Sequence, residues 1–115
     1  MIFGIVLHYN TFTKTRSSQA KMIRQHAAQS DLPFVICGDM NDASLSYAYH
    51  SLSDNLNDAF LCGGKGIAET HDNIKAGLRI DYIFSNKTLK PLDFNINRVS
   101  FSDHHCLRSA FAILQ

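Results

Sequence analysis

Continuous and alternating hydrophobic stretches predict a chain built mainly of strands. Residues 2–7 form a nearly unbroken apolar run, which is typical of a strand covered on both faces. A second short run, rich in residues that favour strands, follows Pro33 and stops at Gly38. Later stretches alternate between apolar and polar positions, as expected of strands with one buried face. The strands expected after the first are therefore 34–37, 78–85, 92–96 and 106–114.

One segment has the spacing of a helix. Between Arg16 and Gln29, apolar and small residues recur at intervals of three and four, and Ser17 or Ser18 could cap the first turn. A shorter helix is expected over 44–52. Residues 55–60 have no decisive pattern, and the glycine-rich stretch 62–67 predicts a turn. The predicted fold class is an α/β (α+β) mixture in which strands predominate.

Length and composition limit the architecture. The chain has 115 residues, of which 45% are hydrophobic and 18% charged, so a single folded domain is expected and a disordered chain or coiled coil is excluded. No apolar run approaches the roughly 20 residues of a membrane span. This segment is therefore expected to be soluble and to make no membrane contact.

The net charge of +1 hides an uneven distribution. Residues 1–30 contain four basic side chains and no acid, whereas residues 31–62 contain five aspartates and no Lys or Arg. The near balance argues against a polybasic nucleic-acid surface as the main feature. The acid-rich middle could bind a divalent cation or could be a solvated loop.

The three cysteines do not have the spacing of a metal site. Cys37, Cys62 and Cys106 lack a CxxC pair, so buried reduced thiols are expected for Cys37 and Cys106. Reduced thiols favour a cytoplasmic location. The chain begins within a predicted buried strand and has no signal peptide, which indicates a fragment of a longer protein.

Four polar segments follow or interrupt the predicted strands. In the first, Asp39 and Asn41 lie two residues apart and would share one face if extended. A carboxylate suits a hard cation or a water, and an amide suits a phosphate oxygen. The alternative is a simple turn, because Gly-Asp and Asn-Asp are common turn dipeptides.

The second segment places Asp81 between apolar neighbours, where a carboxylate needs a partner. It could form a buried ion pair with Arg79 or orient a histidine. The third segment contains Asp103 and His104, which could serve a metal and a proton transfer together or form an ordinary surface loop.

The fourth segment ends in His8, which could be catalytic or a hydrogen-bonded structural residue. Of the other histidines and aspartates, six are given an expectation. His26, His50 and His71 are expected to be solvated, and Asp42, Asp54 and Asp58 to lie at turns or helix ends.

Taken in order, these segments resemble the endonuclease/exonuclease/phosphatase family of deoxyribonuclease-like, metal-dependent phosphoesterases. The matching stretches are 5–8, 34–42, 78–84 and 101–104, so the resemblance covers nearly the whole chain. A generic α/β domain with coincidental motifs is the less favoured reading.

The resemblance implies a role for each matching residue. Asp39 corresponds to the aspartate that handles the attacking water near the metal, and Asn41 to the asparagine that steadies the phosphoryl oxygens. Asp81 corresponds to the aspartate that orients the histidine, here His104, which acts as base or polarises the phosphate. The two other implied roles are metal binding by Asp103 and phosphate contact by His8. The implied cofactor is Mg²⁺ or Mn²⁺, and the implied reaction is hydrolysis of a phosphate ester, in nucleic acid or a small molecule.

The resemblance also implies that part of the fold is missing. Family members are about twice as long and form a two-sheet sandwich, whose first half supplies an asparagine and the principal glutamate ligand. The chain is thus expected to be the carboxy-terminal half of one domain, with weak metal binding and a homo-oligomer covering the exposed face. It could be inactive alone, or a non-catalytic binding or assembly module on the same scaffold. Related bacterial proteins often carry membrane spans before this domain, so the parent could be membrane-anchored.

Overall fold

The computed structural model describes residues 3–8, 13–40, 47–65, 69–71 and 79–114. Within these residues it has six strands and three helices. In chain order they are β1 (Phe3–His8), α1 (Thr13–Ala28), β2 (Phe34–Asp39), α2 (Tyr47–Ser53), β3 (Asn57–Asp58), α3 (Ala59–Gly63), β4 (Asp81–Ser85), β5 (Leu89–Asn97) and β6 (Cys106–Ile113).

The strands form two sheets. The first has four strands in the order β1-β2-β4-β3, with β1 and β2 parallel and β4 antiparallel to both β2 and β3. The parallel pair requires a crossover, which α1 supplies. The second sheet is the antiparallel pair β5 and β6, with an irregularity between Pro91 and Asp93.

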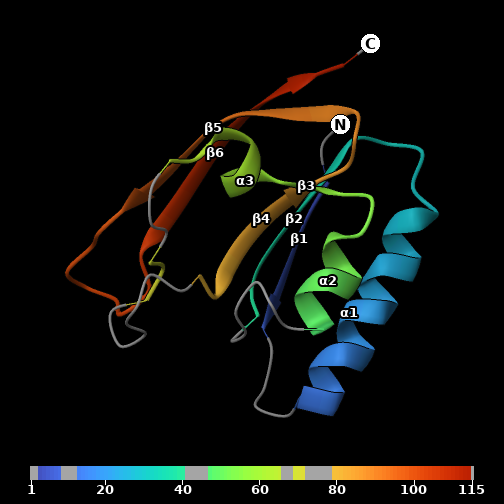
Figure 1. The fold of residues 1–115 in the computed structure, drawn as a ribbon, viewed down its shortest axis with the longest axis horizontal. Coiled ribbons are helices and arrows are strands. Elements are labelled where there is room, and N and C mark those ends of the chain that lie inside the picture. Colours follow the sequence, from blue (N-terminus) through green and yellow to red (C-terminus); the bar gives the residue numbers. More distant parts are fainter. Residues whose placement is uncertain (1–2, 9–12, 41–46, 66–68, 72–78, 115) are drawn as a thin grey trace.

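The molecule is arranged in layers around the four-stranded sheet. Helices α1 and α2 lie against one face, while α3, β5 and β6 lie against the other (Figure 1). Alternation along the strands explains the arrangement, because successive side chains point to opposite faces. On β4, Tyr82 and Phe84 face the helices, whereas Ile83 faces the second sheet.

Each face of the four-stranded sheet has its own hydrophobic core. The core on the helix side is formed by side chains from α1, α2, β2 and β4, and Ala20, Leu52 and Phe84 are almost completely buried. The core on the other side is formed by Ala59, Ile83 and Phe94, together with half-buried side chains of β2 and β6. The predicted α/β mixture with two packed sheets is confirmed.

Two local predictions need correction. Cys62 and Gly63 belong to α3 and not to a turn, because Asp58 caps the helix by accepting a hydrogen bond from the Phe60 backbone N–H. Residues 66 and 67 of that predicted turn lie outside the described residues. Cys106 is exposed on β6, so its predicted burial is wrong.

The cysteines form no disulfide among themselves. All three cysteines are free, and burial raises the pKa of the half-buried Cys37 thiol. In the part of the chain that the structure describes, no helix has the length and apolar character needed to cross a membrane.

Candidate functional site

Strand register brings three predicted residues into one row. The Cα atoms of His8 and Asp39 are partners across β1 and β2, and those of Asp39 and Asp81 are partners across β2 and β4. The row lies where β1 and β2 end and β4 begins. Residues paired across neighbouring strands lie on the same face, so Asp39 and Asp81 share the face that packs against the second sheet.

His104 completes this cluster from just before β6. Its Nδ1 lies 3.0 Å from Oδ2 of Asp81, and its Nε2 lies 3.6 Å from Oδ2 of Asp39. The backbone N–H of His104 donates to the Ser102 hydroxyl at 3.1 Å, which helps to fix the approach to the strand. With Asp81 ionised, Nδ1 carries the donated proton and Nε2 faces Asp39.

The acidic surroundings change the ionisation of this pair. Burial by itself would lower the pKa of His104, but the hydrogen bond to Asp81 and the charges of Asp81, Asp39 and Asp103 raise it above the usual value. Burial raises the pKa of Asp81, and the hydrogen bond and charge of His104 only partly oppose this. The arrangement therefore favours a histidine that can hold and release a proton.

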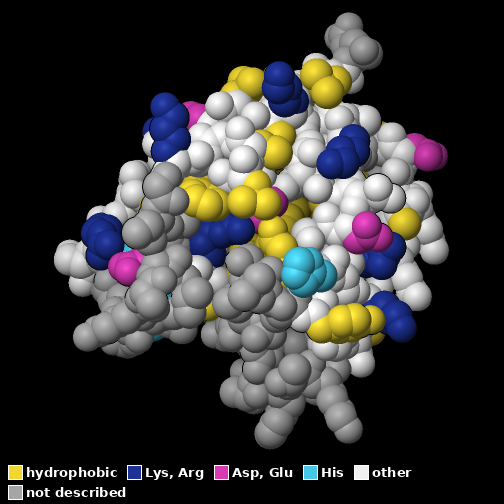
Figure 2. All heavy atoms as spheres, viewed as in Figure 1, with side chains coloured by type: hydrophobic (Ala, Val, Ile, Leu, Met, Phe, Trp, Pro, Cys, Tyr) yellow, Lys and Arg dark blue, Asp and Glu magenta, His cyan; other side chains and the backbone are white. Residues whose placement is uncertain are grey.

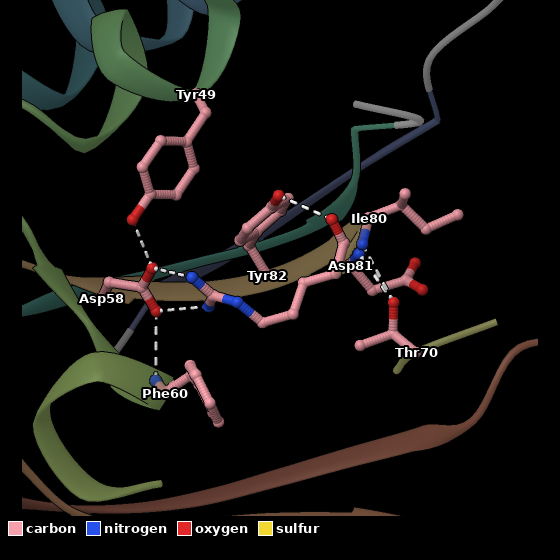
Figure 3. Close-up of polar contacts among 8 residues, drawn as sticks. Tyr49, Asp58, Phe60, Thr70, Ile80, Asp81 and Tyr82 are labelled. Atoms are coloured by element: carbon pink, nitrogen blue, oxygen red, sulfur yellow. Dashed lines mark hydrogen bonds and ion pairs between the residues drawn. The ribbon is translucent and has the colours of Figure 1, made fainter. Parts of the chain in front are cut away.

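The segment 69–71 was not identified as part of the site from the sequence. Thr70 is fully buried, and its hydroxyl oxygen accepts hydrogen bonds from the backbone N–H groups of Ile80 and Asp81 at 3.0 and 3.2 Å (Figure 3). Its carbonyl accepts from the His105 N–H at 2.8 Å. Thr70 thus links the start of β4 to the residue that follows His104.

His71 is also closer to the site than predicted. It forms an isolated antiparallel bridge with His104, and the two rings meet edge to face with centroids 4.4 Å apart. The predicted solvated loop histidine is instead a half-buried neighbour of the site. No signal within residues 69–71 could have shown this, because the contact depends on a bridge to residue 104.

Arg79 does not pair with Asp81. Its guanidinium makes two 2.8 Å contacts with Asp58, and the Tyr49 hydroxyl donates to the same carboxylate at 2.5 Å (Figure 3). The Tyr82 hydroxyl donates to the Arg79 carbonyl at 2.8 Å. The predicted ion pair between Asp81 and Arg79 is therefore wrong. Asp58 instead forms the buried ion pair with Arg79, and it also caps α3.

Among the residues that the structure describes, two groups of side chains have ligand atoms close enough to share a metal ion. They are Asp39, Asp81 and His104, and His71, Asp103 and His104, with the ligand atoms of each group within 4.8 Å of one another. Carboxylate oxygens suit Mg²⁺ and Mn²⁺, so the two carboxylates of the first group fit the implied cofactor. Within these groups, Asp81 lies 3.0 Å from Nδ1 of His104, Asp39 lies 3.6 Å from Nε2 of the same ring, and Asp103 lies 3.2 Å from Nε2 of His71.

The structure leaves some predicted residues untested. Asn41 and Asp42 lie outside the described residues, and for His8 only the backbone is placed. His26 and His50 are exposed on α1 and α2, as predicted. An open pocket beside the cluster is lined by Asp39, Asp81 and residues of the two neighbouring sheets.

The described surface does not concentrate basic charge on the face shown in Figure 2. Lys and Arg side chains are scattered there, with hydrophobic side chains between them. This agrees with the near-neutral net charge and gives no support to a broad phosphate-backbone footprint on the described part of this face.

Comparison with known proteins places the chain in a family. Residues 4–104 match the Endonuclease/Exonuclease/phosphatase family. The search of curated protein sequences found no significant match.

Solved structures share the fold at low sequence identity. A mannosyl-6-phosphatase from Bacteroides thetaiotaomicron is 17% identical with a TM-score of 0.79, and 97% of this chain covers 51% of that one. A functionally unknown conserved protein from Enterococcus faecalis is 19% identical with a TM-score of 0.83, covering 96% of this chain and 49% of that one. Truncated TDP2 from Caenorhabditis elegans is 19% identical with a TM-score of 0.70, and the match covers 96% of this chain and 54% of that one.

The chain spans about half the length of these structures. The family match covers most of its residues, and it includes Asp39, Asp81 and His104. This chain therefore belongs to the endonuclease/exonuclease/phosphatase family.

Proposed function

We propose that this chain is the carboxy-terminal half of a divalent-metal-dependent phosphoesterase domain and carries most of its water- and phosphate-handling groups. The observation that carries the proposal is the placement of His104 between two carboxylates. Its Nδ1 lies 3.0 Å from Asp81 and its Nε2 3.6 Å from Asp39. Family membership supports hydrolysis of a phosphate ester as the reaction.

The acid–base work is assigned to His104 and the two aspartates. Asp81 holds the imidazole through Nδ1 and favours its protonated form, while Nε2 is directed to Asp39. Asp39 orients the attacking water, and His104 takes up or returns a proton at Nε2. A carboxylate that fixes a histidine ring in this way also stabilises the imidazolium formed during the reaction.

Asp39 and Asp103 are the residues that would hold Mg²⁺ or Mn²⁺. Bound there, a divalent cation would supply charge neutralisation at the phosphate and activation of a water. Asn41 is assigned to the phosphoryl oxygens and His8 to phosphate contact. In phosphoryl transfer such positioning and charge stabilisation account for most of the rate.

The substrate class is a phosphate ester, either in nucleic acid or in a small molecule. The name of the neighbouring mannosyl-6-phosphatase supports a small phosphate ester. The net charge of +1 favours the small molecule over a long duplex.

The test is hydrolysis of a generic phosphodiester and a generic phosphomonoester by the 115-residue chain, with and without Mg²⁺ or Mn²⁺. We expect metal-dependent turnover that is lost in Asp39→Ala and His104→Ala. His26→Ala, which changes an exposed histidine on α1, is the matched control and should retain activity. Turnover that survives both site substitutions would contradict the assigned roles. Metal binding at Asp39 and Asp103 without turnover would favour the non-catalytic binding module.

A further inference from the structure

A second cluster of metal-ligand side chains shares His104 with the first. His71, Asp103 and His104 offer ligand atoms within 4.8 Å of one another. His71 comes from the segment 69–71, and the other two come from the segment before β6. The proposed function assigns no role to His71.

The spacing of two of these donors matches that of ligands on one ion. Nε2 of His71 lies 3.2 Å from Oδ2 of Asp103. Two donors that each lie about 2.1 Å from a zinc ion, at the angles of a tetrahedral or octahedral site, are about 3.0–3.4 Å apart. The observed separation therefore needs little adjustment for both atoms to bind the same cation.

The backbone holds the cluster in place without the ion. His71 and His104 face each other across an isolated antiparallel bridge, and the next rung is the 2.8 Å hydrogen bond from the His105 N–H to the Thr70 carbonyl. Thr70 is itself fully buried. Such support of ligand residues by neighbouring groups is typical of metal sites.

The cluster is also reachable from solvent. The side chain of His71 is 14% exposed and that of Asp103 is 59% exposed. A metal ion could therefore enter beside Asp103 and reach the more buried imidazole.

The donor chemistry differs from that of a magnesium site. Mg²⁺ binds oxygen ligands, whereas imidazole suits zinc, nickel and copper. We propose that His71, Asp103 and His104 form a binding site for a nitrogen-preferring divalent transition metal, of which Zn²⁺ is the simplest example. The site goes beyond the proposed function and shares with it only Asp103 and His104.

Sharing His104 has a consequence for the reaction. Nδ1 of His104 is engaged by Asp81, so Nε2 is the nitrogen that a transition metal would take. That nitrogen is the one assigned to proton transfer. Zinc at this site would therefore inhibit an enzyme that Mg²⁺ or Mn²⁺ activates.

The test measures binding and does not depend on turnover. The 115-residue chain is titrated with Co²⁺, followed by visible absorption, and then with Zn²⁺ in competition. We expect one site, and His71→Gln should weaken it by at least the roughly tenfold that loss of a supporting residue costs a metal site. His26→Gln removes an exposed histidine on α1 and should leave the affinity unchanged. Equal affinity in the wild type and His71→Gln, or no binding by the wild type, would overturn the proposal.

A second measurement needs no variant. In a histidine-selective NMR spectrum of the wild type, substoichiometric Zn²⁺ should shift the ring signals of His71 and His104 and leave those of His26 and His50 in place. Shifts confined to His26 and His50 would refute the site. Failure of the proposed function would appear differently, as absent hydrolysis with Mg²⁺ or Mn²⁺ while Zn²⁺ still binds.

Discussion

At the scale of single residues, the contact between Asp81 and His104 is the one on which the proposed chemistry depends most. Asp81 is half-buried, accepts from Nδ1 of His104 at 3.0 Å, and starts a strand held by Thr70. An aspartate in this position determines which nitrogen of the imidazole carries the proton. A substitution that removes the charge of Asp81 but keeps its shape separates this control of the His104 tautomer from the packing of the side chain.

We predict that Asp81→Asn lowers kcat of the metal-dependent hydrolysis by about 100-fold or more, the usual contribution of a positioned acid–base group. The amide keeps the volume but favours the wrong ring tautomer. Steady-state kinetics with a generic phosphodiester measure the loss, and circular dichroism checks the fold. Asp31→Asn, at an exposed aspartate before β2, is the control. An Asp81→Asn enzyme as active as the control would refute the positioning role.

Tyr49 provides a prediction about pH. Burial, followed by the hydrogen bond to Asp58 and the charge of that carboxylate, raises the pKa of Tyr49 to about 12. Free tyrosine has a pKa of about 10, so between these values the folded chain keeps a proton that the unfolded chain has lost. This contribution to stability is complete below about pH 10 and is lost as the pH rises toward about 12.

The full loss over about two pKa units is on the order of 3 kcal/mol, since one pKa unit corresponds to about 1.4 kcal/mol. Urea unfolding at about pH 9 and about pH 11 should show roughly half of this loss as a fall in the free energy of unfolding. Tyr49→Phe should make that fall smaller, whereas Tyr47→Phe, on the exposed face of the same helix, should not. Equal pH dependence in both variants would contradict the assignment to Tyr49.

At the scale of elements, the Arg79–Asp58 pair joins the start of β4 to β3 and α3. Both side chains are more than nine-tenths buried, and the guanidinium lies 4.5 Å from the Phe60 ring centroid. The same carboxylate caps α3 and accepts from Tyr49 on α2. One ion pair therefore connects both sides of the sheet.

We predict that Arg79→Met lowers the free energy of unfolding by about 3–5 kcal/mol, because it leaves Asp58 buried without its partner charge. Arg24 makes a comparable pair with Asp54, but both side chains there are about half exposed. Arg24→Met should cost less than about 1 kcal/mol. Urea denaturation compares the two, and similar losses would contradict the importance of burial.

The packing of α3 against β5 depends on a glycine. A Cβ at Gly63 would lie 2.9 Å from the backbone Cα and carbonyl carbon of Asp93, and neither can rotate away. We predict that Gly63→Ala destabilises the fold by about 1–3 kcal/mol through overpacking. Leu61→Ala, at an exposed position of the same helix, is the control in thermal unfolding. Equal melting temperatures would show that α3 and β5 can separate without cost.

At the scale of the whole molecule, the chain resembles half of longer proteins and exposes apolar side chains. Leu92 on β5 is 57% exposed and Ile113 on β6 is 59% exposed. In the described sheet, β1 is an edge strand of the four-stranded layer. Exposed apolar side chains and open edges both favour association.

We predict that the isolated chain forms a dimer or higher oligomer through the side that carries β5 and β6. Sedimentation equilibrium measures the association. Leu92→Lys should weaken it, whereas Met22→Lys, on the exposed face of α1 across the sheet, should not. A monomer at tens of micromolar, or equal effects of the two variants, would contradict the prediction.

The main strands and the first helix could be predicted from local pattern because burial periodicity is a property of neighbouring residues. The apolar run before His8, the run before Asp39 and the alternation around Asp81 each specify a strand with a polar residue at its end. Residues 55–60 could not be assigned, and residues 62 and 63 were wrongly predicted to be a turn. The physical reason is that β3 and α3 depend on the contact between Asp58 and Arg79, 21 positions away.

The sequence by itself determined the fold class, the family and the set of residues available for chemistry. Only the tertiary structure decided which of them meet: Asp81 pairs with His104, Arg79 pairs with Asp58, and His71 lies beside Asp103. The physical reason is the separation along the sequence of the residues involved. Hydrophobic periodicity involves residues a few positions apart, whereas a charged side chain pairs with a residue that the fold brings close from a distant strand or loop.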